Sequence, residues 1–370
     1  MRKLAIVCLA LASLAIACKQ AVPAPRPTIP LVERIAADTT GLHRLAATAG
    51  HQGGHGAIAL LGEPSDVIRL ARHMQHVDAL DNIDARTVRD SLPDFAGEEF
   101  QAILDVMHAP YAHFFALELN RESLDSLREA SVRNALFAWD STCYSRATDK
   151  AATLQKSRSK VLIYTSFLQE QYGLFDVDTL QQLTGGGSYL LAPARTLLED
   201  AIRQGAKHIA VWAPRAVRQS DVFPDVYEEL GGTGTVTVLT PDAALDVRTE
   251  LRNLLRQYHT TELPLDALIL CDYHPDLASL ASEVALIRQS TSDQDRAYNQ
   301  MLSSSFFVLD PCTSLTAAAY RLLRRENLFA HRISLPQVRY YETAESLSGE
   351  TVLEEASPRY VQSAYVSDFD

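Results

Sequence analysis

The sequence lacks most of the features that identify a function at sight. It holds no Gly-x-Ser-x-Gly motif, which argues against an α/β-hydrolase. Its glycine run at residues 184–188 follows a helical segment and precedes a strand, the reverse of the order in a phosphate-binding loop. The net charge of -12 disfavours nucleic acid as a partner. Beyond residue 18, no apolar run approaches the ~20 residues of a membrane span.

The first 18 residues have the pattern of an export signal. Two basic residues precede an apolar run at residues 4–16, which is too short to cross a bilayer and shows no polar positions at helical spacing. Small residues then stand before Cys18. This resembles the lipobox of bacterial lipoproteins, although Ala15 stands where such motifs usually carry leucine. The resemblance implies a lipoprotein signal peptide at residues 1–18 that ends at a lipidated Cys18. The alternative is an ordinary signal peptide cleaved at another small residue.

A proline-rich segment follows the cysteine. Residues 19–30 carry four prolines, which stiffen the chain and block regular pairing. We interpret residues 19–40 as a tether between lipid and domain. Lys19 is not the aspartate that retains many lipoproteins in the inner membrane, so the resemblance implies an outer-membrane lipoprotein that faces the periplasm.

Cysteine is scarce, with five residues in the chain. Cys8 falls in the signal and Cys18 is the lipid acceptor, so Cys143, Cys271 and Cys312 remain. Three is an odd number in a compartment that permits disulfides. At least one of them should stay free or pair with another molecule.

Regular alternation of strands and helices dominates the chain. We expect a strand at residues 56–62, a helix at 65–77 capped by Ser65, a long loop that enters a helix near Gly97, and a strand at 134–141. Six short apolar runs then predict strands at residues 160–166, 188–193, 207–214, 235–241, 267–273 and 306–312. Helical patterns separate them at residues 197–205, 222–232, 247–259, 276–289 and 314–327. Continuous apolar strands that alternate with helices indicate parallel sheets covered on both faces.

Polar residues gather where these strands end, which is where parallel sheets bind ligands. The predicted ligand-binding residues are Thr165, Ser166, Ser220, Asp272, Asp310 and Thr313. The predicted catalytic residues are Cys271, Cys143, Asp140 and His274. Turns also need polar residues at these positions, so a purely structural role stays open for most of them.

We expect no metal site. Glycines between His51 and His55 disfavour the helix that would bring the two rings to one ion. His73 and His76 lie one helical turn apart, and a solvated face explains them. The acidic segment at residues 81–99 lacks the spacing of a calcium-binding loop, and we interpret it as a helix-capping loop.

The second half of the chain, residues 160–346, resembles the aspartate/glutamate racemase family and most nearly the glutamate racemases. The resemblance rests on the order of elements in residues 188–214, 216–230, 265–277, 306–323 and 336–346. Ser220 and Phe223 occupy the places of a family turn and helix start. The segment LDALILCDYHPDL is similar to the family strand that ends in Gly-Cys-Thr-His-Tyr-Pro, and it keeps Cys271 and Pro275. It lacks the glycine, and its three middle residues differ, so no family motif is intact.

The resemblance implies an α/β fold of two flavodoxin-like parallel-sheet lobes, each a three-layer αβα sandwich. The first lobe would comprise residues 41–186 and 291–345, and the second residues 187–290. The C-terminal tail, residues 346–370, either packs as an arm or stays loose. A type I periplasmic binding protein shares the alternating pattern, and the return of the chain to the first lobe after residue 290 distinguishes the racemase-like layout.

The resemblance also implies cofactor-independent chemistry. Racemisation needs one base to remove the α-proton and a second acid to return a proton on the opposite face. The family uses two cysteines, and Cys271 is one candidate, with Asp272 and His274 close to it in sequence. The other is Cys143 or Asp140, because the strand at residues 160–166 offers Tyr164, Thr165 and Ser166 but no thiol. Cys271 can equally be a buried small residue at a strand end.

Two functions from different classes remain. In the first, the chain is an exported, lipid-anchored protein that binds an amino acid or a similar small carboxylate between its lobes. In the second, it is an active amino-acid racemase or isomerase that uses Cys271 with Cys143. Neither requires a cofactor, the membrane contact is through the lipid alone, and racemases of this type often form homodimers.

Overall fold

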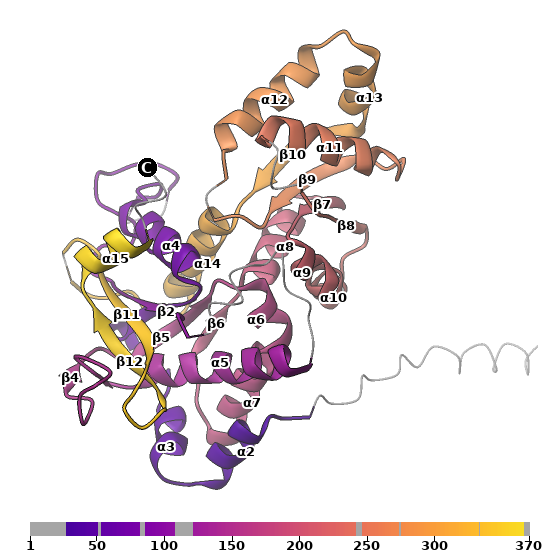
Figure 1. Ribbon diagram of the computed structural model, residues 1–370. Coiled ribbons are helices and arrows are strands. Elements are labelled where there is room, and N and C mark those ends of the chain that lie inside the picture. The colour runs from indigo at the N-terminus through magenta and orange to yellow at the C-terminus, as the bar shows by residue number, and fades with distance from the viewer. Residues whose placement is uncertain are drawn as a thin grey trace, which may run out of the picture.

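The protein is described by a computed structural model, which covers residues 27–50, 53–81, 86–107, 121–241, 246–273, 275–332 and 334–365. Cys18 and the predicted signal therefore lie outside the described residues. Figure 1 shows two lobes stacked one above the other, each built on its own sheet.

The first lobe is built on a six-stranded sheet. Its strands, in spatial order, are β12 (Thr351–Ala356), β11 (Gln337–Glu345), β2 (Glu99–Leu104), β1 (Ala57–Gly62), β5 (Ser159–Tyr164) and β6 (Tyr189–Leu191). All neighbours are parallel except β12, which runs antiparallel to β11 at the edge. In the central strand β1, Ile58 and Leu60 enter one core cluster and Ala59 and Leu61 another. Burial of both faces explains why this strand reads as a continuous apolar run.

The second lobe is built on a four-stranded parallel sheet. Its strands, in spatial order, are β10 (Leu302–Leu309), β9 (Leu265–Leu270), β7 (His208–Trp212) and β8 (Thr235–Leu239). A separate two-stranded sheet pairs β3 (Thr142–Cys143) with β4 (Leu154–Gln155).

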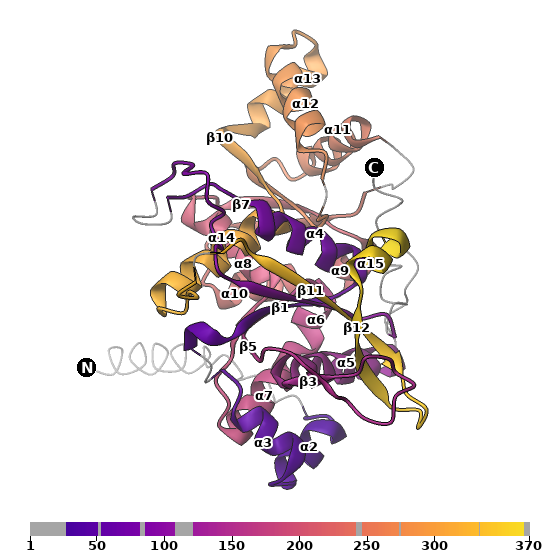
Figure 2. The same ribbon diagram turned by 90° about the vertical axis from the view of Figure 1, so that its left-hand side faces the viewer.

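Helices form three layers around these sheets (Figure 2). The layer between the two sheets contains α4 (Pro64–His76), α8 (Pro193–Arg203), α10 (Val222–Glu229) and α14 (Pro311–Arg325), whose buried side chains join one cluster with both sheets. The outer face of the first sheet carries α2 (Pro30–Ala37), α3 (Gly41–Ala47), α5 (Arg121–Trp139) and α7 (Leu174–Thr184). The outer face of the second carries α11 (Val247–His259), α12 (Leu277–Gln289) and α13 (Asp293–Met301). The short helices are η1 (Gly53–His55), α6 (Phe167–Tyr172), α9 (Arg215–Gln219) and α15 (Pro358–Tyr365).

The two-lobe α/β fold predicted from the sequence is confirmed, and each of the six predicted strands of the second half overlaps an observed one. Two elements of the first half were wrong. The chain enters strand β2 after Gly97, not a helix, and Phe100, Ala102 and Leu104 alternate with Ile103 between two cores.

The predicted strand at residues 134–141 is instead the end of helix α5. The apolar run there is short, but buried Leu127, Ser131, Asn134 and Ala138 recur at helical spacing. Helix α4 also begins earlier than predicted. Glu63 is its N-cap and Pro64 its first residue, because proline suits the first turn, so Ser65 lies inside the helix.

The boundaries between the two lobes differ from those predicted from the sequence. Strand β6 pairs with β5, so the first sheet extends past residue 187, and β10 pairs with β9, so the second sheet extends past residue 290. The chain returns to the first lobe later, through α14 to β11. In the tail, β12 pairs antiparallel with β11 and therefore packs as an arm.

Within the described residues, none of the helices combines the length and the hydropathy that crossing a membrane requires.

Candidate functional site

The carboxyl ends of the two sheets meet at Tyr273. This residue follows β9 in the second lobe, and its hydroxyl donates a hydrogen bond of 2.7 Å to the carbonyl of Thr165, which follows β5 in the first lobe. The thiol of Cys312, in the first turn of α14, donates to the Tyr273 carbonyl at 3.2 Å. Tyr273 is 4% exposed, so both bonds are shielded from bulk water. Strand ends of both lobes therefore lie around Tyr273. Parallel sheets commonly bind ligands at the carboxyl ends of their strands.

Gly62 brings the tips of β1 and β5 together. Its φ of +145° lies in a region that side chains disfavour, and a Cβ there would collide with Oγ1 of Thr165. The Thr165 amide and hydroxyl both donate to the Leu61 carbonyl, at 2.9 and 3.3 Å. The amide and hydroxyl of Thr165 thus hold the ends of β1 and β5 together.

The first turn of α4 brings carboxylates to this junction. Burial raises the pKa of Asp66 well above its usual value, and the neighbouring charges of Glu63 and Asp272 raise it further. Arg69, one turn later on α4, lies 3.8 Å from Asp272, whose side chain is 61% exposed. The ion pair Arg69–Asp272 links the first lobe to the second.

Glu170 of α6 approaches the junction from another side. Its carboxylate accepts the amides of Ala194 and Arg195, at 2.6 and 2.8 Å, at the start of α8. A helix N-terminus favours a negative charge, which explains this position. Burial nevertheless raises the pKa of Glu170 to about 7. The carboxyl group therefore titrates near neutral pH.

Cys271 stands at the end of β9, beside these carboxylates. Its amide donates to the Trp212 carbonyl at 3.0 Å, which fixes the strand end. Burial raises the pKa of its thiol well above 9, and the charges of Asp272 and Glu170 raise it further. At neutral pH the free protein therefore carries Cys271 as a thiol, a proton donor rather than a base.

Cys271, Glu170 and Asp66 share an unusual environment. Each is only half-buried, yet burial is the first cause of its raised pKa. Tyr273 connects the three, because the charges of Asp66, Glu170 and Cys271 all contribute, after burial, to raising the pKa of its hydroxyl. These side chains gather where the strand ends of the two lobes meet.

Four other predicted ligand-binding residues hold the fold. Ser166 is the N-cap of α6 and accepts the Gln169 amide at 3.3 Å. The Ser220 hydroxyl donates to the Val217 carbonyl at 2.7 Å. Asp310 is the N-cap of α14 and accepts the amide of exposed Thr313 at 2.9 Å. Ser166 and Asp310 follow strands β5 and β10, whereas Ser220 follows helix α9 and Thr313 lies in the first turn of α14. Their polar groups serve local turns.

The structure does not bring Cys143 to Cys271. Cys143 lies in β3, is 1% exposed, and joins the core cluster on the outer face of the first sheet, whereas Cys271 packs against the cluster between the sheets. The residue after Cys143, Tyr144, makes backbone hydrogen bonds with Leu353 and Glu355 of the edge strand β12. The expectation that Cys143 faces Cys271 took residues 134–141 as a strand, but residues 134–139 end helix α5 on the outer face of the first sheet.

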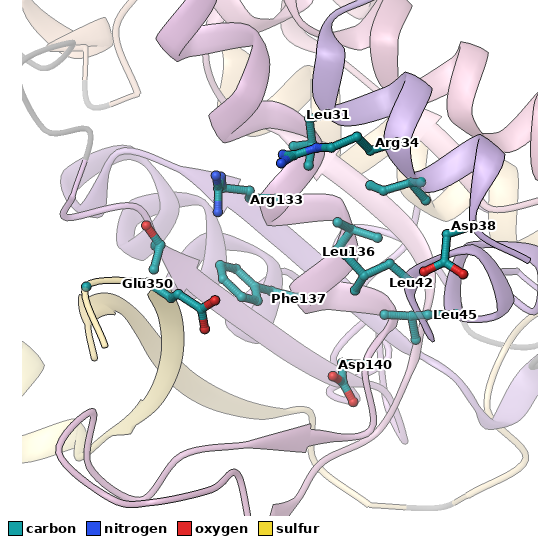
Figure 3. Close-up of a pocket in the computed structure, with 13 residues that line it drawn as sticks. Leu31, Arg34, Asp38, Leu42, Leu45, Arg133, Leu136, Phe137, Asp140 and Glu350 are labelled. Carbon is teal, nitrogen blue, oxygen red and sulfur yellow. The ribbon is translucent and has the colours of Figure 1, made fainter. Parts of the chain in front are cut away.

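Asp140 also lies away from the strand ends around Tyr273, on the outer side of the first lobe. It lies in a surface groove of about 620 Å³ between α2, α3, α5 and the turn that joins β11 to β12, as Figure 3 shows. Its carboxylate accepts the amide and the hydroxyl of Thr142, both at 2.9 Å, and so closes a turn. The groove floor includes Leu31, Ile35 and Leu136, each buried. Leu42, which is 46% exposed, also lines the groove.

His274, predicted beside Cys271, lies outside the described residues, as does His51 of the glycine-rich segment. No cluster of His, Cys, Asp and Glu in the described ranges could hold a metal ion. In the acidic segment, Asp94 accepts the amides of Ala79 and Leu80, and Glu98 pairs with Lys160 at 2.7 Å. Both are structural.

Sequence reasoning missed Asp66, Arg69, Gln169 and Glu170, and it did not single out Tyr273. The first four follow the ends of β1 and β5 by four to seven residues, inside helices α4 and α6, whereas the predicted residues stand directly after a strand or in a turn. The signal available was a carboxylate in the first turn after a strand, in PSDVIR and SFLQE.

Comparison with known proteins gives a likeness of structure only. No protein-family model matches the sequence, and no curated protein sequence matches it. The crystal structure of a glutamate racemase isoform from Bacillus anthracis is similar, with a TM-score of 0.50 and 16% identity over 80% of this chain and 91% of that one.

Two further structures are similar at 12% identity, over 80% of this chain and 91% of theirs. They are glutamate racemase from Francisella tularensis with D-glutamate, at a TM-score of 0.48, and glutamate racemase from Thermus thermophilus with beta-chloro-D-alanine, at 0.46. With the sheet order and the meeting of strand ends at Tyr273, the likeness to the Bacillus anthracis structure shows that this chain has the two-lobe α/β fold of the aspartate/glutamate racemases.

Proposed function

We propose that this protein binds a small amino-acid-type ligand in an interlobe cleft at the strand ends around Tyr273. The observation that carries the proposal is the set of half-buried side chains around Tyr273, where burial governs the pKa of Cys271, Glu170 and Asp66. Perturbed titratable groups from both lobes at facing strand ends are typical of a ligand site.

The cleft offers partners for both ends of such a ligand. The first turn of α4, a helix of 13 residues, has no side-chain cap, so its amides and the positive end of its dipole suit a carboxylate. Asp66, in the same turn, and Asp272 of the other lobe suit an ammonium group. A ligand that touches both lobes would hold them together.

A second candidate function is proton transfer at the α-carbon, and the placement of Glu170 favours it. With a pKa of about 7, Glu170 titrates where a general base works best, and its charge acts on the Cys271 thiol. In this scheme ionised Glu170 removes the α-proton, and the Cys271 thiol returns a proton to the opposite face. A carboxylate then replaces the first thiol of a two-cysteine racemase.

The test has two stages. Binding of amino acids is first measured by isothermal titration calorimetry and by thermal shift. The control variant is Asp178→Asn on the outer helix α7. Each binder is then incubated in deuterated water, and α-proton exchange is followed by NMR with wild type, Cys271→Ala and Glu170→Gln. Binding without exchange supports the binding function alone. Exchange that both variants abolish supports proton transfer, and the absence of any binder contradicts the proposal.

We further propose that the protein is exported and anchored to the outer membrane through lipid on Cys18, facing the periplasm. The support is the signal pattern at residues 1–18 and the proline-rich tether that leads to α2. The test is incorporation of radiolabelled palmitate by the wild type and by Cys18→Ser, followed by membrane fractionation. Palmitate on the wild type and none on the variant is the expected result. Equal labelling of both, or labelling of neither, contradicts the proposal.

A further inference from the structure

We propose that the groove between α2, α3, α5 and the β11–β12 turn, here called the outer groove, binds the zwitterionic head group of a membrane phospholipid. The inference goes beyond the lipid proposed on Cys18, because it assigns a membrane contact to the folded domain itself. Three features carry it: an apolar floor that is partly open to solvent, rim charges of both signs, and a position where the chain enters the domain.

The outer groove has the size of a ligand site and an apolar floor. Its volume is about 620 Å³, within the range of ~300–1,000 Å³ that is common for small-molecule pockets. Leu45 and Phe137 are half-buried and pack against the outer core cluster, and Leu42 is 46% exposed. Apart from Phe137, the apolar side chains that line the groove are aliphatic. Such a floor suits the glycerol and the first carbons of an acyl chain.

A second exposed leucine borders the outer groove. Leu347 is 78% exposed, in the turn whose Gly349 and Glu350 line the groove. Two backbone hydrogen bonds of 2.9 Å, which both involve Ser346, close this turn. Figure 3 shows Leu42 and Glu350 on opposite sides of the groove. Single exposed leucines are ordinary on protein surfaces, but an exposed leucine on each side of an apolar floor forms a patch that a bilayer interface would cover.

Two arginines of the outer groove suit a phosphate group. Arg34 of α2 and Arg133 of α5 both line it, and Figure 3 shows them on the side opposite to Asp140. Among the described residues, the Arg34 guanidinium has no hydrogen-bond or ion-pair partner. Arg133 lies 3.5 Å from Glu129, at the limit of a hydrogen bond. Both guanidinium groups stay charged at neutral pH, and each can give two parallel N–H donors to a phosphate.

The carboxylates of the outer groove suit an ammonium group. Asp38 accepts the amide and the hydroxyl of Thr40, at 3.0 and 2.6 Å. Asp140 accepts the same two groups of Thr142, so both aspartates already close turns. Glu350 is exposed at the groove rim. A head group of one sign would be repelled by part of this rim, whereas a zwitterion complements the arginines and the carboxylates together.

The outer groove lies where the chain enters the domain. Helix α2, which forms one wall, begins at Pro30, close to residue 27, where the described chain begins. Figures 1 and 2 show α2, α3 and the β11–β12 turn at the end of the first lobe that lies away from the second lobe. Residues 18–27 span at most about 30 Å when fully extended. A lipid on Cys18 would therefore keep the groove within reach of the membrane surface.

The experiment compares soluble short-chain lipids on the full chain. Dissociation constants for dihexanoyl phosphatidylethanolamine, dihexanoyl phosphatidylglycerol and free phosphoethanolamine are measured by isothermal titration calorimetry at pH 7.5, below the micelle concentrations. We expect the zwitterionic lipid to bind at least about fivefold more tightly than the anionic lipid, which lacks the ammonium group. Free phosphoethanolamine lacks the acyl chains and should bind at least about tenfold more weakly than the zwitterionic lipid.

Substitutions at the rim locate each part of the head group. Arg34→Gln should weaken both lipids by at least about fivefold, because both contain the phosphate. Glu350→Gln should weaken the zwitterionic lipid and leave the anionic lipid unchanged or tighter. Arg296→Gln, at an exposed position of the second lobe, is the control and should change neither. Thermal unfolding of each variant checks that the fold is intact.

Hydrogen exchange of the full chain on vesicles of phosphatidylethanolamine and phosphatidylcholine tests the surface directly. We expect the vesicles to protect residues 31–45, 133–140 and 346–351, which form the walls of the outer groove. Arg34→Gln should reduce this protection, and Arg296→Gln should not.

The outcomes that would overturn the inference differ from those that test the amino-acid site. Free phosphoethanolamine that binds as tightly as the zwitterionic lipid would indicate a soluble ligand instead of a membrane. Groove protection that needs no lipid and grows with protein concentration would indicate a second copy of the chain. Failure of both lipids to bind, or a zwitterion preference that survives Glu350→Gln, would overturn the inference as well. None of these results bears on amino-acid binding around Tyr273.

Discussion

Buried charged groups differ between the amino ends of the strands in the first sheet, here called the amino edge, and their carboxyl ends, here called the carboxyl edge. At the amino edge, Lys160 donates to Glu98 at 2.7 Å and to the Leu328 carbonyl at 2.7 Å, and Glu98 also accepts the Ala330 amide. Both side chains of the pair are fully buried. At the carboxyl edge, Asp66 and Glu170 are half-buried, and burial raises the pKa of both carboxyl groups. The same sheet therefore has one edge with a fully buried ion pair and one edge with carboxyl groups that burial makes harder to ionise.

The difference between the two edges distinguishes charges that stabilise the fold from carboxyl groups of the proposed site. A fully buried charge is tolerated only with a partner and satisfied hydrogen bonds, and the amino edge meets both conditions. The carboxyl edge holds carboxyl groups whose pKa burial raises, and the side-chain oxygen of Gln169 has no hydrogen-bond partner among the described residues. Perturbed titratable groups of this kind are more typical of functional sites than of structural ion pairs. The comparison supports the proposal that the carboxyl edge, and not the amino edge, binds the ligand.

The largest loss of stability should follow from removing one partner of the buried Lys160–Glu98 ion pair at the amino edge. Glu98→Gln leaves the Lys160 ammonium buried without its counter-ion, and we expect a loss of about 3–5 kcal/mol in the free energy of unfolding. Urea denaturation followed by circular dichroism measures it. Asp293→Asn, which removes the exposed partner of Arg296, is the control and should change stability little. Equal effects of the two substitutions would contradict the comparison.

A smaller loss should follow from separating the lobes at Tyr273. Tyr273→Phe removes the buried hydroxyl that bonds to the Thr165 carbonyl, and we expect a loss of about 1–2 kcal/mol because that carbonyl loses its donor. Tyr189→Phe, whose hydroxyl bonds to Glu326 in a more exposed place, is the matched control and should cost less. Urea unfolding of both variants checks this, and a greater loss at Tyr189 would argue against a closed junction.

Glu170 predicts a change in the pH dependence of stability. Its folded pKa of about 7 exceeds the reference value of 4.5, so the folded state holds the proton more tightly than the unfolded chain. The stabilising contribution is complete below about pH 4.5 and is lost as the pH rises through 7. Glu170→Gln should therefore flatten the decline of unfolding free energy between these values, and Glu228→Gln, an exposed control on α10, should not. Identical slopes for wild type and Glu170→Gln would contradict the account.

The smallest effect concerns the Cys271 thiol. Since burial and the charges of Asp272 and Glu170 raise its pKa, alkylation by iodoacetamide should be slow at pH 7 and accelerate only in alkaline solution. Asp272→Asn should move that onset to lower pH. Mass spectrometry of the Cys271 peptide measures both, and buried Cys143 is the internal reference. Rapid alkylation at pH 7 would contradict the raised pKa of the Cys271 thiol.

The fold was predictable where the chain is most regular. From residue 160 onward, strands buried on both faces read as continuous apolar runs, and each overlaps its predicted range. The first half was harder because its apolar runs were ambiguous. Residues 134–139 end a long helix, and residues 99–104 form a strand behind the turn at Gly97. Return of the chain to the first sheet through β11 depends on pairing over long distances, which no local pattern contains.

The site was only half predictable. Cys271 and Asp272 directly follow a strand, so the sequence places them at a sheet edge. Asp66 and Glu170 lie one turn into helices, and their meeting with Tyr273 of the other lobe depends on how two sheets pack. Cys143 and Cys271 join different core clusters, because the segment before Cys143 is the end of helix α5 and not the expected strand.

Amide hydrogen exchange of the full chain, with and without a saturating amino acid found in the binding scan, tests the interlobe site most directly. The account predicts protection in three segments, residues 63–69, 165–170 and 271–273, at the facing ends of the two sheets. Protection confined to the outer groove of α2 and α5, or no change in the three segments, would contradict it.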